Sequence, residues 1–268
     1  MKKVIKFLVS LAVLMLVLPS SLAFAKSDVE SIQKNGKLVL GTSADFPPFE
    51  WIILKDGKEE VVGVDIELGQ KIADELGVEL EVRNVGFDTL IQSVKTGRID
   101  MALAGISQTE ERAQQVDFSV PYYEGESYIL VAKDKADKVT TIQDLKDLKV
   151  GVQKGTIQET YLLNNQLDID LTSMPKNDVL IETLKTGKLD AVVMDAVTAG
   201  EFLRMNEDTI TKASETIPTD DEGYSVAVAK DNTSLLEVIN KVIEEAKDNE
   251  EIKQSLEKYL DLAAEDNK

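Results

Sequence analysis

The sequence of 268 residues contains no cysteine, no histidine and a single tryptophan. Without cysteine the chain can form no disulfide, present no catalytic thiolate and carry no lipid on a cysteine beside its N-terminal segment. Without histidine it lacks the side chain that most often acts as a base at neutral pH or binds a metal ion. We therefore expect no cofactor and no metal site, and a fold that is stabilised by packing alone.

Positive charge is also scarce. The chain has 30 lysines and arginines against 49 aspartates and glutamates, which gives a formal net charge of −19. Such an acidic surface repels nucleic acid and anionic lipid, so we expect neither as a partner. The same charge attracts cationic solutes only weakly, because salt screens it, and a solvated acidic surface is the more ordinary explanation.

Apolar runs long enough to span a membrane are absent from the sequence. Residues 7–18 are apolar but too few to cross a bilayer comfortably; three lysines precede them, and the triplet Ala-Phe-Ala follows at residues 23–25. We predict a signal peptide over residues 1–25, cleaved after Ala25, and hence an exported protein in the periplasm or at the cell surface. An uncleaved membrane anchor is the alternative.

One pattern occurs twice in the chain. Residues 88–105 align without a gap on residues 178–195, with the identical pairs Asp88/Asp178, Leu90/Leu180, Ile91/Ile181, Lys95/Lys185, Thr96/Thr186, Gly97/Gly187 and Asp100/Asp190. In each copy the aspartate can cap a helix, the apolar residues have helical spacing, the glycine can end the helix in the left-handed conformation, and a β-rich run follows. The repetition predicts two similar α/β lobes with a cleft between them.

Strand and helix patterns alternate along the rest of the chain. We predict strands at 37–41, 78–82, 128–132, 149–152 and 224–229, and helices from a cap at Asp65 to Gly77, from Thr109, at 156–163, from Asp195 to Arg204, at 234–246 and at 250–260, with a polar stretch at 207–222. The chain crosses between lobes near residues 124–127 and 220–223, which predicts a hinge. Lobe I then comprises residues 26–124 plus 223–268, and lobe II comprises residues 125–222.

Five blocks of sequence resemble one protein family. They are Gly-Thr-Ser-Ala-Asp-Phe-Pro-Pro-Phe-Glu at 41–50 with 63–67, then 87–91 with 95–100, 104–112 with 117–123, 151–159 and 189–196. In this order they resemble the polar amino-acid binding proteins of ABC importers, the extracellular solute-binding proteins of family 3. The resemblance implies a two-lobed α/β fold of the type II periplasmic binding proteins, with two hinge crossings and a ligand cleft. It also implies a non-enzymatic protein, which we expect to be a monomer, that hands one free amino acid to ABC permease subunits in the membrane.

Two charged residues carry the predicted binding chemistry. Arg112 follows Thr109 in the first turn of a predicted helix, where its guanidinium can pair with a carboxylate, although such a residue is often a solvated surface arginine. Asp195 ends the second repeated strand, where ligands of open α/β sheets bind, and it can equally cap the next helix. The resemblance assigns the α-carboxylate of the ligand to Arg112 and its α-ammonium to Asp195.

The resemblance adds turns and aromatic side chains to this site. Polar and backbone groups are expected from the turns at Ala104, Gly105 and Ser107 in the first lobe and at Gln153, Thr156, Ile157 and Gln158 in the second. Phe46 and Phe87 are expected to sandwich the aliphatic stem of the ligand, although an aromatic after a strand more often belongs to the core.

The identity of the ligand side chain depends on the next positions. Ser43 stands where many relatives that bind cationic amino acids carry an acid or an amide, but Asp45, two residues along, can take that role. Residues 155–159, with the following Tyr-Leu-Leu, resemble arginine binders more than glutamine binders. We therefore favour arginine or lysine, with glutamine or histidine next. We rank acidic ligands lower because Arg112 is already assigned to the α-carboxylate of the ligand.

Two other classes of protein stay open at this point. Some secreted enzymes of this fold dehydrate cyclic carboxylates, and Glu50 or Glu159 could supply the general acid. A sensor or adhesin would use the same cleft and differ only in its partner.

Overall fold

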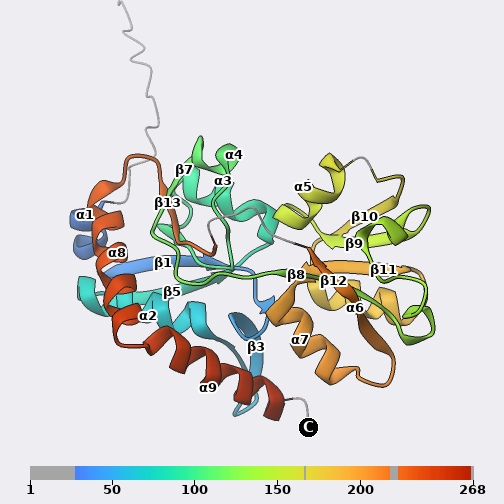
Figure 1. The fold of residues 1–268 in the computed structure, drawn as a ribbon. Helices are drawn as coiled ribbons and strands as arrows, with labels where there is room; N and C mark the ends of the chain where they lie inside the picture. The colour runs from blue at the N-terminus through green and yellow to red at the C-terminus, as the bar shows by residue number, and fades with distance from the viewer. Residues whose placement is uncertain (1–27, 166, 218–222, 267–268) are drawn as a thin grey trace, which may run out of the picture.

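The computed structural model describes residues 28–165, 167–217 and 223–266, and it shows an α/β protein of two lobes (Figure 1). Each lobe is built on a five-stranded sheet, with the strand orders β5-β1-β6-β13-β7 and β10-β9-β11-β8-β12. The predicted two-lobed α/β architecture is therefore confirmed. The predicted signal peptide, residues 1–25, lies outside the described residues.

The first sheet combines parallel and antiparallel pairs: β1 is parallel to β5 and β6, and β13 is antiparallel to β6 and β7. Its strands are β1 (Lys37–Thr42), β5 (Glu79–Asn84), β6 (Met101–Ala102), β7 (Val116–Phe118) and β13 (Ala227–Ala229). Its helices are α1 (Val29–Asn35), α2 (Val64–Leu76), α3 (Leu90–Lys95), α4 (Glu110–Ala113), α8 (Thr233–Asp248) and α9 (Glu251–Asp266). A small antiparallel sheet is added by β2 (Asp45–Phe46), β3 (Glu50–Lys55) and β4 (Lys58–Val62).

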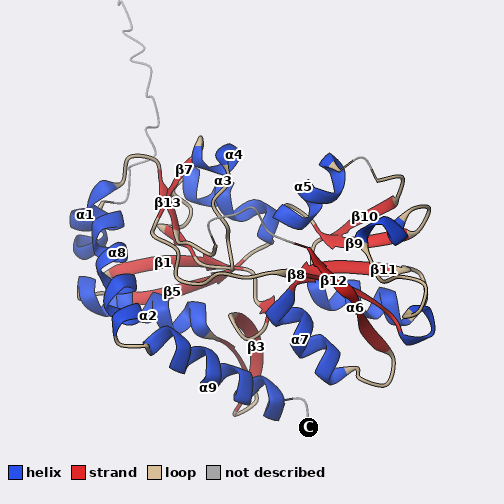
Figure 2. Ribbon diagram, viewed as in Figure 1, coloured by secondary structure: helices blue, strands red, loops and turns tan. Residues whose placement is uncertain are grey.

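The second sheet has the same plan: β9 is parallel to β10 and β11, and β8 is antiparallel to β11 and β12. Its strands are β8 (Ser127–Ala132), β9 (Lys149–Gln153), β10 (Asp170–Met174), β11 (Ala191–Asp195) and β12 (Ile210–Ile217). Its α-helices are α5 (Ile157–Asn164), α6 (Asn177–Lys185) and α7 (Ala196–Met205). Figure 2 shows that helices lie on both sides of the strands in each lobe.

The chain passes from one lobe to the other between β7 and β8 and returns between β12 and β13. The strands that follow these passages occupy equivalent places, because β8 lies antiparallel to β11 and β13 lies antiparallel to β6. The crossing segments lie side by side, since Tyr224 forms bridges with Tyr123 and with Ser107. Of the predicted second crossing at 220–223, only Gly223 is among the described residues.

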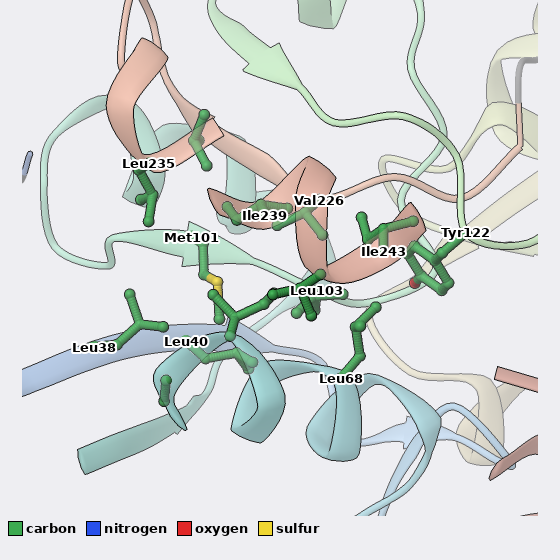
Figure 3. Close-up of a cluster of buried hydrophobic side chains, with 14 of the residues drawn as sticks. Leu38, Leu40, Leu68, Met101, Leu103, Tyr122, Val226, Leu235, Ile239 and Ile243 are labelled. Carbon is green, nitrogen blue, oxygen red and sulfur yellow. The ribbon is translucent and has the colours of Figure 1, made fainter. Parts of the chain in front are cut away.

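Apolar side chains fill both faces of each sheet. In the first lobe, Leu38 and Leu40 of β1 pack between α2 and α8 together with Met101 and Leu103, as Figure 3 shows. A second cluster around Leu90, Val94 and Ile99 covers the opposite face. The second lobe likewise has one cluster on each face of its sheet. Because every central strand is buried on both sides, these strands read as continuous apolar runs.

Both repeat copies fold into a helix followed by a strand, as predicted: α3 leads to β6 and α6 leads to β11. Gly97 and Gly187 take the predicted left-handed conformation, with φ of 67° and 71°. The predicted aspartate caps are wrong. Asp88 lies in the 3₁₀ turn η1 (Phe87–Thr89), which precedes α3, and Asp178 lies inside the first turn of α6.

Two further expectations are corrected by the structure. Asp65 does not cap α2, because Gly63 precedes that helix and the Asp65 side chain is buried beneath it. The polar stretch predicted at 207–222 contains strand β12, which buries Ile210, Ala213 and Ile217 against the second lobe. An edge strand exposes its other residues to solvent, so its composition is largely polar.

The C-terminal helix α9 runs along the lower edge of the molecule in Figure 1, from α2 of the first lobe towards α7 of the second. Tyr259 of α9 packs edge-on against Trp51 of β3, with 5.9 Å between the ring centroids. None of the helices in the described part of the chain combines the length and the apolar character that a membrane crossing requires.

Candidate ligand-binding site

A cavity lies between the two lobes and is lined by residues of both. Every residue that the sequence predicted for the site lines it: Ser43, Phe46, Phe87, Ala104, Gly105, Ser107, Arg112, Gln153, Thr156, Ile157, Gln158 and Asp195. The structure therefore brings the predicted residues together in one place. Their contacts with a ligand stay predictions.

Six further residues line the cavity: Asp45, Glu50, Asn177, Val193, Met194 and Tyr224. The sequence suggests Asp45 as the acid that replaces the one missing at position 43, and Glu50 as a general acid of an enzyme. Val193 and Met194 precede Asp195 in β11, so the prediction of Asp195 could have found them. Asn177 and Tyr224 have no such local signal, because they reach the cavity from the start of α6 and from the return crossing.

Arg112 spans the cleft between the lobes. Thr109 caps the short helix α4, as predicted, by accepting a hydrogen bond from the Arg112 backbone at 3.2 Å. The guanidinium donates to the Ser107 carbonyl in the first lobe at 2.5 Å and to the Gly155 carbonyl in the second at 2.8 Å. Because a guanidinium carries five N–H donors in a planar fork, the same group can also bind a carboxylate. Arg112 is thus a half-buried bridge between lobes, not a solvated surface residue.

The turn before α5 meets this bridge from the second lobe. Thr156 caps α5: its hydroxyl accepts from the Glu159 backbone at 3.2 Å and donates to the Gln153 carbonyl at 2.8 Å. Gly155 has a φ of +82°, and a Cβ there would lie 3.0 Å from the Cα of Asp88 in the first lobe. Glycine therefore permits both this conformation and the close approach of the lobes. The start of α5 faces the cavity, where its positive dipole end favours an anion.

Asp195 lines the cavity and caps a helix at the same time. Its carboxylate accepts from the backbones of Val197 at 2.9 Å and Thr198 at 3.2 Å at the start of α7, and it accepts from the phenol of Tyr224. Burial raises the pKa of Asp195 to about 6, although these hydrogen bonds oppose the rise. At neutral pH the group is therefore ionised, so it can accept a hydrogen bond from an ammonium.

Gly105 is the counterpart of Asp195 in the first lobe. Its φ is +56°, and a Cβ would lie 2.6 Å from the Phe46 ring, so the ring packs directly on the glycine backbone. The Gly105 N–H donates to Asp65 at 3.1 Å, and both oxygens of Asp65 accept from the Tyr122 hydroxyl at 2.8 and 2.9 Å. Asp65 is completely buried, and this burial raises its pKa to about 7. Asp65 therefore holds the turn at Gly105 from behind.

Asp45 lies where β2 meets the second lobe. Its carboxylate accepts from the Ser43 hydroxyl at 3.1 Å and from the Asn177 backbone at 2.7 Å. Asn177 also donates through its side chain to Gln153 at 3.2 Å. Burial raises the pKa of Asp45 to about 6, while the hydrogen bonds from Asn177 and Ser43 lower it. A carboxylate is thus present beside Ser43.

Glu50, at the start of β3, is completely buried. Neither of its carboxyl oxygens receives a hydrogen bond from a donor on any residue that the structure describes. Burial, followed by the nearby carboxyl groups of Asp65 and Asp45, raises its pKa well above the usual range. Such a group requires either a proton or a cation to neutralise it.

The two predicted aromatic residues lie on different segments of the first lobe, Phe46 in β2 and Phe87 in η1. Phe46 is stacked on Phe49 with 5.5 Å between centroids and lies 6.1 Å from the ring of Tyr224, so an aromatic cluster holds it in place. The ring of Phe87 lies 5.7 Å from the guanidinium carbon of Arg112. A sandwich of a ligand stem between Phe46 and Phe87 stays a prediction.

Over residues 38–262 the chain matches the family described as bacterial extracellular solute-binding proteins, family 3. It is 32% identical over 226 residues to the arginine-binding extracellular protein ArtP of Bacillus subtilis, covering 84% of this chain and 86% of that protein.

Two solved structures are similar in fold and sequence. An amino acid ABC transporter substrate-binding protein, AbpA of Streptococcus pneumoniae, bound to L-arginine, has a TM-score of 0.84 and 39% identity, covering 87% of this chain and 98% of that one. An ancestral arginine-binding protein bound to glutamine has a TM-score of 0.76 and 38% identity, covering 84% and 97%.

Proposed function

The chain belongs to family 3 of the bacterial extracellular solute-binding proteins, and we propose that it captures a cationic amino acid, arginine or lysine, for an ABC importer. As a solute-binding protein it is not an enzyme, so the dehydratase alternative is set aside. The ABC permease subunits would receive the amino acid from the closed cleft.

The charge of the cavity lining carries this proposal. Three carboxyl residues line the cavity, Asp45, Glu50 and Asp195, whereas Arg112 is the one cation among the described lining residues. A zwitterionic amino acid would pair its α-carboxylate with Arg112 and its α-ammonium with Asp195. Two carboxyl groups are then left for the ligand side chain. A cationic side chain offsets one of these charges, whereas an acidic side chain is repelled.

The positions of these groups suggest how the ligand lies. The α-carboxylate would rest between the Arg112 guanidinium and the start of α5, with the α-ammonium at Asp195. The stem would pass between Phe46 and Phe87 towards Glu50. Arginine suits the end of the cavity near Glu50, because its planar guanidinium can donate to several carboxylate oxygens at once. The arginine named for ArtP and for the AbpA structure supports the same choice.

Glutamine or histidine is the second candidate ligand. The amides of Gln153 and Asn177 lie at the cavity and could pair with a neutral polar side chain. The glutamine-bound ancestral protein shows that a protein named for arginine can also hold glutamine. Neither observation provides a partner for the buried carboxyl of Glu50, so we rank these ligands lower.

The proposed function places the mature protein outside the cytoplasm. We propose that residues 1–25 are removed as a signal peptide after Ala25, and that the mature protein works as a monomer. Lobe I (26–124 plus 223–268) and lobe II (125–222) would then move about the crossings near 124–127 and 220–223. The ligand would favour the closed state because it contacts Arg112 on one lobe and Asp195 on the other at once.

A thermal-shift screen of the twenty natural amino acids tests this proposal. A ligand present at ~100 times its Kd adds roughly 2.7 kcal/mol to the free energy of unfolding, which is easily detected. We expect the largest shift with arginine or lysine, a smaller one with glutamine or histidine, and none with glutamate. A larger shift with glutamate, or none with any amino acid, would contradict the proposal.

A further inference from the structure

Two buried carboxyl groups lie together behind the cavity. Glu50 at the start of β3 and Asp65 in the first turn of α2 are both completely buried. Asp65 accepts hydrogen bonds from Tyr122 and from the Gly105 backbone, so it is held in position. Glu50 receives no hydrogen bond from a donor on the described residues, and its chain neighbour Phe49 accepts from the Asp65 backbone at 3.0 Å.

Three carboxyl groups lie near Glu50, each on a different element. Asp65 faces it from α2, Asp45 from β2 and Asp195 from the end of β11, and the Tyr122 hydroxyl lies beside Asp65. The cation of the cavity, Arg112, directs its guanidinium to two backbone carbonyls, and no lysine lines the cavity among the described residues.

A buried carboxyl group that receives no hydrogen bond is stable only when it carries a proton or meets a cation. Asp65 already accepts from two donors, which stabilises its ionised form, whereas Glu50 has no such donor. A proton therefore belongs on Glu50, which is completely buried and has no donor to stabilise its ionised form. The nearby carboxyl groups of Asp65, Asp45 and Asp195 act in the same direction, because each raises the pKa of Glu50.

We propose that Glu50 holds a proton in the ligand-free protein, and that a cationic ligand side chain expels this proton when it enters the cavity. The inference rests on the proposed function, since it needs a cationic ligand. The arriving positive charge replaces the proton as the neutralising group of Glu50, so ligand and proton compete for one carboxyl. A ligand with a neutral side chain leaves the proton in place.

The proposal has a defined pH dependence. Where Glu50 is protonated in the free protein and ionised in the complex, arginine affinity rises about tenfold per pH unit. Asp45 and Asp195, with pKa values of about 6, reduce affinity further in acid, so the measurement belongs above that range. The α-ammonium group is common to all amino acids. Its contribution to the pH dependence therefore cancels when the affinities of two ligands are compared.

Isothermal titration calorimetry of the wild-type protein at neutral pH tests the proposal without any variant. Arginine and glutamine are titrated in phosphate and in Tris, buffers that differ in ionisation enthalpy. We expect the heat of arginine binding to depend on the buffer, corresponding to release of about one proton per ligand, and that of glutamine not to depend on it. Arginine binding whose heat is the same in both buffers overturns the inference and leaves the proposed function intact. A protein that binds glutamine but not arginine overturns both.

A matched pair of variants locates the proton. Glu50→Gln keeps the size of the side chain but removes the titrating group, so arginine binding should weaken and lose its buffer dependence. Glu59→Gln, on exposed strand β4, removes one carboxylate away from the cavity and should change neither. Proton release that persists in Glu50→Gln would overturn the assignment.

Discussion

The two repeat copies end in different residues at the same cavity. In the first lobe, the α3–β6 unit leads to Gly105, which contributes only backbone and packs against Phe46. In the second lobe, the α6–β11 unit ends at Asp195, which contributes a carboxylate and caps α7. A helix begins directly after Asp195, whereas Gly105 is followed by a segment that pairs with Tyr224. The same unit therefore delivers a backbone turn in one lobe and a charged side chain in the other.

The two lobes contribute different groups to the proposed binding chemistry. The acids of the first lobe do not come from its repeat copy but from β2, β3 and α2, as Asp45, Glu50 and Asp65. The small sheet that carries the first two has no counterpart in the described part of the second lobe. We infer that the first lobe selects the ligand side chain, while the second binds the ammonium group.

Replacing Arg112 by alanine should have the largest effect, because it removes the group that joins the two lobes across the cleft. We expect arginine affinity, measured by calorimetry, to fall by about 2–5 kcal/mol, since the α-carboxylate loses its charged partner. Arg83→Ala serves as the control, because Arg83 pairs with Glu81 on the exposed surface of the same lobe. Near-normal affinity of Arg112→Ala would refute the assignment.

Asp195→Asn separates the two roles of the residue that ends the second copy. Asparagine caps helices about as well as aspartate, so thermal unfolding without ligand should change little. Arginine affinity should fall by about 1.5–3 kcal/mol, because a charge-assisted hydrogen bond to the ammonium is lost. Asp208→Asn, at an exposed aspartate beyond α7, is the control. A loss of stability with unchanged affinity would mean that Asp195 acts only as a cap.

Gly105→Ala tests the turn that ends the first copy, and Gly187→Ala is the matched control. Both glycines have positive φ, but a Cβ at Gly105 meets Phe46 at 2.6 Å, whereas one at Gly187 meets nothing within 4 Å. Gly187→Ala should cost about 1 kcal/mol of unfolding free energy from backbone strain alone. Gly105→Ala should cost more in urea denaturation and should also weaken arginine binding. Equal costs would show that the Phe46 ring moves aside freely.

Lys154→Ala should have the smallest effect. Lys154 pairs with Asp88 across the cleft at 2.8 Å, but its side chain is 58% exposed. Exposed ion pairs contribute about 0–1 kcal/mol, so arginine affinity should fall slightly, and less at high salt. Lys230→Ala breaks a similar pair with Asp117 within one lobe and should leave affinity unchanged. A tenfold loss in Lys154→Ala would show that this rim contact controls closure.

Much of the fold could be predicted because its signals are local. The repeated helix-to-strand units, the caps Thr109 and Thr156 and the left-handed Gly97 and Gly187 all depend on neighbours a few residues apart. Strands β10 and β12 were not predicted, because edge strands expose half of their residues and read as polar loops. The small β2–β3–β4 sheet was missed for a similar reason, since β4 is mostly exposed.

The candidate site likewise contains residues that the sequence indicates and residues that only tertiary contacts bring to it. The resemblance to a family supplied residues such as Arg112 and Asp195, and the structure gathers them around one cavity. Asn177 has no comparable signal, because its role depends on contact with Asp45, 132 positions away in the chain. Asp65 was misread as a helix cap, because the sequence gives no sign that Tyr122 and Gly105 approach it.

The sequence by itself determined two α/β units, their helix starts and the absence of thiol or imidazole chemistry, since these follow from composition and from contacts between near neighbours. Only the tertiary structure decided that Glu50 and Asp65 are buried together beside the cavity. Burial and the closeness of like charges set the protonation of a carboxyl group, and both arise only when β3 packs against α2 and the lobes meet.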